Sequence, residues 1–72
     1  MSVTESLSVQ VNGEPRRVSC GASIADMLRE LGLDPARLAV ERNLEIVPRS
    51  TLGEVEVAEG DFFEIVHFVG GG

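Results

Sequence analysis

Hydrophobic and polar residues alternate at the start of the chain. Over residues 7–11 the apolar positions recur at every second residue, a period typical of a strand that buries one of its faces. Asn12-Gly13 follows directly, and this dipeptide is a strong signal for a tight hairpin turn. We therefore predict a hairpin whose returning strand covers Arg16–Cys20, with Val18 and Cys20 facing the core.

The spacing of apolar residues then changes from two to three and four. Four of them recur at i, i+3, i+4 and i+7, which places them on one face of a helix: Ile24, Met27, Leu28 and Leu31. Ser23 precedes this run and Asp26 follows three residues later, a pattern that resembles a capping box. Gly32 supplies a left-handed C-terminal cap. The pattern predicts a helix over Ile24–Leu31.

The second half of the chain contains short apolar runs separated by turn residues. In order, the pattern predicts a turn or single helical turn over Asp34–Arg37, a strand over Leu38–Arg42, a tight turn at Asn43-Leu44, a strand over Glu45–Val47, an irregular or 3₁₀ segment over Arg49–Gly53 with Leu52 facing inward, and a last strand over Phe62–Val69.

This order of elements predicts an α+β fold. A hairpin, one helix and a further set of strands form a mixed sheet of four or five strands with the helix packed on one face. If the last strand pairs parallel with the first, the arrangement is the β-grasp. We expect one domain over residues 1–72, with 70–72 as an exposed, flexible glycine tail. The expected core joins Met27, Leu28 and Leu31 to Val9, Val18, Val40 and Ile65.

Charge narrows the classes of partner. Twelve acidic residues against six basic ones give a net charge of −6. This balance disfavours nucleic acid and anionic membranes, since both attract cationic proteins. It favours a protein partner with a basic face.

Cysteine usage indicates a compartment. The single cysteine, Cys20, cannot form a disulfide within the chain, so a reducing cytoplasm is the expected location. No basic and apolar leader or membrane-spanning run is present in the sequence, and we expect neither a signal peptide nor a membrane anchor.

Three glycines follow the last predicted strand directly. Gly70-Gly71-Gly72 has no side chain with which to build a core. A frayed end or an expression scar is one interpretation. The interpretation that we favour is that a backbone without Cβ atoms enters a narrow tunnel of an enzyme and presents the carboxylate of Gly72.

Three stretches resemble a known family. The segment Val40–Ser50, together with Glu59–Asp61 and Glu64–Gly72, is similar to the sulfur carrier proteins of thiamin biosynthesis, the ThiS family of ubiquitin-like proteins. The resemblance extends over residues 7 to 72. Leu44 departs from it, because the family usually has a polar residue or glycine at this turn position.

The resemblance implies a carrier and not an enzyme. It implies that a ThiF-like adenylyltransferase uses ATP and magnesium to adenylate the carboxylate of Gly72, and that Gly70 and Gly71 lead it into the active site. Sulfur from a cysteine-derived persulfide, supplied through a cysteine desulfurase, then gives a thiocarboxylate that thiazole synthase consumes. No cofactor or metal bound by the chain itself is implied.

The last strand also predicts a docking surface. Phe63 and Ile65 share one face of this strand, whereas four residues share the other: Phe62, Glu64, Val66 and Phe68. If the helix covers the first face, then Phe62, Val66 and Phe68 are available to a partner. Burial of both faces in a small core is an equal alternative.

The remaining candidates have structural explanations. His67 lacks a carboxylate or nucleophile at a recognisable spacing and is expected to be a surface histidine. Cys20 is expected to be a small buried hydrophobe instead of a reactive thiol. Five acidic residues are expected to form a solvated face that steers a partner: Glu54, Glu56, Glu59, Asp61 and Glu64.

Three other functions remain open at this point. The small subunit of molybdopterin synthase is also a β-grasp thiocarboxylate carrier and would differ in its partner. A ubiquitin-like protein modifier would be attached to target lysines, although the chain has no lysine with which to form branched chains. A structural or toxin-partner domain would have no use for the glycine tail.

Overall fold

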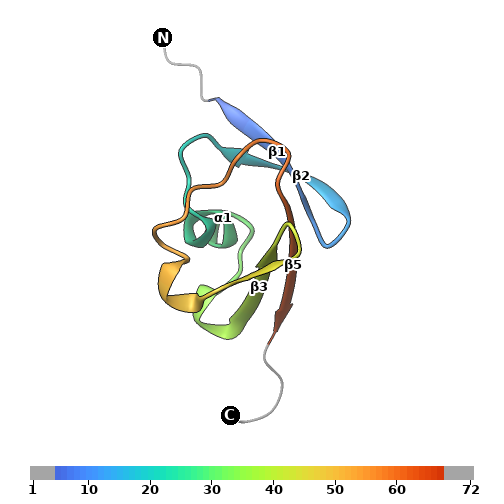
Figure 1. The fold of residues 1–72 in the computed structure, drawn as a ribbon. Coiled ribbons are helices and arrows are strands. Elements are labelled where there is room, and N and C mark those ends of the chain that lie inside the picture. Colours follow the sequence, from blue (N-terminus) through green and yellow to red (C-terminus); the bar gives the residue numbers. More distant parts are fainter. Residues whose placement is uncertain (1–4, 68–72) are drawn as a thin grey trace.

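The computed structural model of the chain describes residues 5–67. A five-stranded sheet lies against a single α-helix (Figure 1). The elements are β1 (Ser6–Val11), β2 (Glu14–Ser19), α1 (Ile24–Glu30), the 3₁₀ turn η1 (Pro35–Arg37), β3 (Leu38–Arg42), β4 (Glu45–Val47), the 3₁₀ turn η2 (Arg49–Thr51) and β5 (Phe62–His67).

The strand order of the sheet is β2-β1-β5-β3-β4. β1 pairs antiparallel with β2 but parallel with β5, in a register that sets Gln10 beside Phe62. β5 pairs antiparallel with β3, and β3 with β4. The last strand thus lies at the centre of the sheet beside the first, which is the β-grasp arrangement that the sequence predicts.

The β1–β2 hairpin forms at the expected turn but with different strand bounds. Asn12 and Gly13 both take positive φ values, 52° and 84°, as a type I′ turn requires. β2 begins two residues earlier than predicted, so Pro15 lies within it, opposite Gln10. Proline is tolerated there because β2 is an edge strand with one unpaired side.

The prediction that Cys20 faces the core is wrong. β2 ends at Ser19, and Cys20 is exposed in the turn that follows. Its backbone N–H still bonds to the carbonyl of Glu5 at 3.0 Å. Cys20 and Gly21, which takes a φ of +89°, form this turn together, so the strand alternation that would place Cys20 inward ends at Ser19.

The ends of α1 confirm the predicted caps. The Asp26 N–H donates to Ser23 Oγ at 3.0 Å and the Ser23 N–H donates to the Asp26 carboxylate at 3.2 Å, which completes the capping box. At the other end, Gly32 has a φ of +80°. The Leu33 N–H bonds to the Leu28 carbonyl at 2.8 Å, as in a Schellman motif.

The core lies between α1 and the sheet face that α1 covers. Met27 and Leu28 are fully buried, as expected, whereas Leu31 is the C-cap of the helix and only half-buried at the edge of the core. The long connection to β5 contributes Leu52 and Val57. β5 is described only as far as His67, so Phe68 and Val69 of the predicted strand lie outside the described residues.

Candidate functional site

The helix covers one face of the sheet and leaves the other open. We call the side turned away from α1 the outer face. Four large hydrophobic residues are exposed on this face or at the turn beside it: Leu44, Ile46, Phe62 and Val66. Exposed apolar side chains that gather on one face of so small a protein are typical of a docking surface.

β5 divides its side chains between the two faces. Phe63 and Ile65 are buried under the helix, whereas Val66 is 61% exposed and Phe62 is 40% exposed. The strand alternation therefore places Phe62 and Val66 where the sequence predicts them, and burial of both faces is ruled out for Val66. Phe68, the third predicted docking residue, lies outside the described part of the chain.

Sequence reasoning missed Ile46 and Leu44. Ile46 of β4 pairs with Glu41 of β3, and the next residue of β4, Val47, pairs with buried Val40. Alternation along β4 therefore turns Ile46 outward, where it is 78% exposed. The sequence could have predicted the exposure of Ile46. A strand was expected over Glu45–Val47, and if Val47 faces the core, the adjacent Ile46 must face the other way.

Leu44 occupies the tight turn between β3 and β4. Asn43 and Leu44 both have positive φ, 51° and 74°, so the turn is of the type I′ kind in spite of its leucine. The Leu44 side chain is 77% exposed and makes the turn apolar. The departure from the family pattern thus leaves the turn geometry intact and enlarges the apolar surface.

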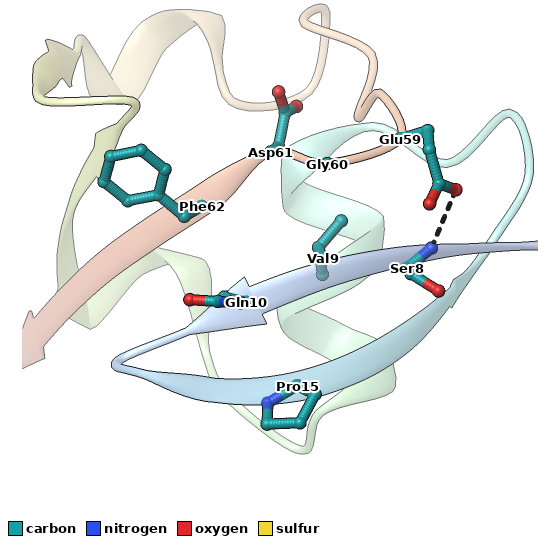
Figure 2. A pocket seen from close by; sticks show the side chains of 8 residues that line it. All are labelled: Ser8, Val9, Gln10, Pro15, Glu59, Gly60, Asp61 and Phe62. Carbon is teal, nitrogen blue, oxygen red and sulfur yellow. Dashed lines mark hydrogen bonds between the residues drawn. The ribbon is translucent and has the colours of Figure 1, made fainter.

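An open hollow lies beside Phe62, at the end of the outer face nearest the β1–β2 hairpin (Figure 2). Its volume is about 310 Å³, and the lining includes Gln10 from β1, Pro15 from β2 and Phe62 from β5. Glu59 closes one side, where its carboxylate accepts a hydrogen bond from the Ser8 N–H at 3.0 Å. Pro15 and Phe62 give this hollow an apolar lining beside the polar groups of Ser8, Gln10 and Glu59. Such a hollow can receive an apolar side chain of a partner.

Asp61 is not part of a solvated acidic face, contrary to expectation. It is 5% exposed. Its carboxylate accepts hydrogen bonds from Arg42 Nε at 3.0 Å, Asn43 Nδ2 at 3.1 Å and the Ala58 N–H at 2.9 Å. Asp61 is therefore a buried residue, immediately before β5, whose carboxylate holds three neighbouring donors by hydrogen bonds. The other four acidic residues of the set are exposed, as predicted: Glu54, Glu56, Glu59 and Glu64.

The other candidates carry no visible site. His67 is exposed at the end of β5, as predicted, and Cys20 is exposed and free. Within residues 5–67, no cluster of three or more histidine, cysteine or acidic side chains is arranged to hold a metal ion. In the same range, no helix has the length and apolar character needed to cross a membrane. The predicted tail, Gly70-Gly71-Gly72, lies outside the described residues.

Known proteins resemble this chain in both sequence and structure. It is 48% identical over 66 residues to a thiazole synthase of Paramagnetospirillum magneticum, a match that covers 92% of the chain but 20% of that relative. A thiazole synthase of Magnetococcus marinus matches over the same share. The chain therefore spans about one fifth of the length of these relatives.

Two further matches cover most of this chain and most of the matched protein. The sulfur carrier protein ThiS of Bacillus subtilis is 46% identical over 50 residues, which cover 69% of this chain and 76% of that protein. The crystal structure of a thiamine biosynthesis protein, ThiS, from Geobacter metallireducens superposes with a TM-score of 0.77 at 29% identity. It covers 92% of this chain and 100% of that one. The ThiS family model matches residues 9–72. Both the sequence and the β-grasp architecture thus lead to one conclusion: the chain belongs to the ThiS family.

Proposed function

We propose that this chain is a sulfur carrier for the thiazole ring of thiamin. The observation that carries the proposal is the match to the ThiS family, which continues through Gly72. The likeness to thiazole synthases supports the thiazole pathway over molybdopterin synthesis. The chain acts as a protein co-substrate, and the catalytic groups belong to its partners.

The reactive group of the proposed carrier is the carboxylate of Gly72. A carboxylate is a poor electrophile, and adenylation converts it into an acyl group with a good leaving group. A carboxylate oxygen of Gly72 attacks the α-phosphorus of ATP and pyrophosphate leaves. The outer sulfur of a cysteine-derived persulfide, supplied through a cysteine desulfurase, then displaces AMP and gives an acyl disulfide. A second thiol of the partner protein cleaves the S–S bond of this acyl disulfide, which releases the thiocarboxylate and leaves the two cysteine sulfurs joined in a disulfide. ATP and magnesium belong to a ThiF-like adenylyltransferase.

The described residues would guide the tail to its partners. Phe62 and Val66 form an apolar surface on β5, the strand that leads toward the glycines. We propose that this surface, with Phe68, docks on the adenylyltransferase and on thiazole synthase in turn. Gly70 and Gly71 then enter the active site, because a backbone without Cβ atoms passes where other residues cannot. A reducing cytoplasm suits this chemistry and the free thiol of Cys20.

Pyrophosphate release tests the proposal directly. The intact chain is mixed with ATP, magnesium and the ThiF-like adenylyltransferase, beside a variant that lacks Gly72 and the variant Gly71→Val. Removal of one residue withdraws the carboxylate by about 3.5 Å, which destroys the near-attack geometry of roughly 3–3.5 Å. We expect both variants to lose pyrophosphate release and to keep the melting temperature of the intact chain.

Intact mass provides the second measurement. Addition of the sulfur donor should raise the mass of the chain by about 16 Da, because sulfur replaces one oxygen of the terminal acyl group. Adenylation of the truncated chain at the normal rate would show that Gly72 is not the reactive residue. A ladder of heavier adducts on a denaturing gel of cell extract would instead identify a protein modifier.

A further inference from the structure

Two carboxylates lie directly opposite each other on the outer face. Glu41 of β3 and Glu64 of β5 are partners in the antiparallel register. Residues in such positions have Cβ atoms about 4.5–5.5 Å apart, and like charges there are destabilising. The fold therefore carries an unfavourable pair at the middle of its open face.

Five of the six arginines of the chain are bonded to other groups. Four arginines pair with other carboxylates: Arg16 with Glu14, Arg29 with Asp26, Arg37 with Asp34, and Arg42 with Asp61. Arg17 bonds to the hydroxyls of Ser6 and Ser8. Neither the Glu41 nor the Glu64 side chain makes a hydrogen bond or ion pair with any residue in the described range 5–67.

Apolar side chains surround the two carboxylates. Ile46 lies beside Glu41 on the β4 side. Phe62 and Val66 lie two residues before and after Glu64, on the same face. A partner that covers these apolar groups excludes water from the centre of the patch, and a charge-assisted hydrogen bond formed there is stronger than one at a wet rim.

We propose that the Glu41–Glu64 pair is the receptor for an arginine or lysine of thiazole synthase, with Ile46, Phe62 and Val66 as the apolar ring around it. This inference rests on the proposed function. An arginine suits the pair best, because its planar guanidinium offers several donors in fixed directions and can bond to two carboxylates at once. The contact turns a repulsive pair into a specific anchor beside the strand that leads to the tail.

Charge argues against other occupants of this surface. A second copy docked by the same face around a two-fold axis would bring its own Glu41 and Glu64 toward the first pair, which adds repulsion. An anionic lipid surface is repelled in the same way. A protein with one exposed cation amid apolar side chains matches both features of the surface.

Affinity for thiazole synthase tests this inference. The dissociation constant is measured by titration calorimetry for the intact chain and for the double variant Glu41→Gln/Glu64→Gln. The matched control is Glu54→Gln/Glu56→Gln. It also removes two negative charges, but from the side of the molecule beside the start of α1. We expect the first double variant to bind at least about tenfold more weakly and the control to bind within about twofold of the unchanged chain.

Thermal melting and thiocarboxylate formation separate the possible outcomes. The Glu41→Gln/Glu64→Gln variant should melt no lower than the unchanged chain, since the substitution removes a repulsion. Equal losses of affinity in both double variants would reveal a general charge effect and overturn the anchor. The anchor is also overturned if the Glu41→Gln/Glu64→Gln variant binds thiazole synthase as tightly as the chain without substitutions does. If the unchanged chain fails to bind thiazole synthase yet becomes a thiocarboxylate, the anchor is wrong and the carrier function stands. Failure of both measurements overturns the proposed function itself.

Discussion

Arg42 Nε donates a hydrogen bond to the Asp61 carboxylate at 3.0 Å, which joins β3 to the residue immediately before β5. Asn43 strengthens the same junction. Its side-chain Nδ2 donates to Asp61 at 3.1 Å, while its Oδ1 accepts from the Phe62 N–H at 3.0 Å. The junction determines where β5 enters the sheet, and hence where Phe62 emerges on the outer face.

Replacement of Asp61 tests the importance of this junction. In Asp61→Ala the Arg42 guanidinium, the Asn43 amide and the Ala58 N–H all lose their acceptor. We expect a loss of about 3 kcal/mol in the free energy of unfolding, because three part-buried hydrogen bonds are lost at about 1 kcal/mol each. Urea denaturation measures it. The control Glu59→Ala removes an exposed carboxylate with one bond, to the Ser8 N–H, and should cost about 1 kcal/mol or less. Equal costs would contradict the assignment of Asp61 as the main anchor.

The positive φ of Leu44 predicts that its replacement by glycine stabilises the turn. A residue with a Cβ at a φ of +74° is strained by roughly 1–2 kcal/mol relative to glycine. Leu44→Ala retains the Cβ and the strain, whereas Leu44→Gly removes both. Because the side chain is exposed, little packing is lost in either variant. We expect Leu44→Gly to unfold at a higher urea concentration than Leu44→Ala, by about 1 kcal/mol. The reverse order would show that the turn is not strained.

Val66 and Ile65 are neighbours on β5 that test the division between docking and core. Val66 faces outward and Ile65 is 7% exposed. We expect Val66→Ser to leave the melting temperature nearly unchanged and to weaken binding to thiazole synthase several-fold, as loss of an apolar interface residue does. Ile65→Ser should instead lower the melting temperature sharply, because it leaves a cavity and a buried hydroxyl. A large fall in melting temperature for Val66→Ser would assign that residue to the core.

The elements of this fold were predictable where neighbouring residues determine them. The Asn12-Gly13 turn, the Ser23–Asp26 capping box and the Gly32 cap depend on contacts within a few residues, and all three form as the sequence predicts. The alternation in β5 also placed Val66 outward. The resemblance to the ThiS family came from contiguous segments, and the family match confirms it.

Strand pairing decided what local pattern could not. Cys20 was expected inside, but β2 ends one residue before it and the turn at Gly21 exposes it. Asp61 was expected in water, but its partner Arg42 is 19 residues away in sequence and comes within reach only when β3 pairs with β5. The same pairing sets Glu41 against Glu64. A contact between distant residues depends on register, and register emerges only when the whole sheet closes over one helix.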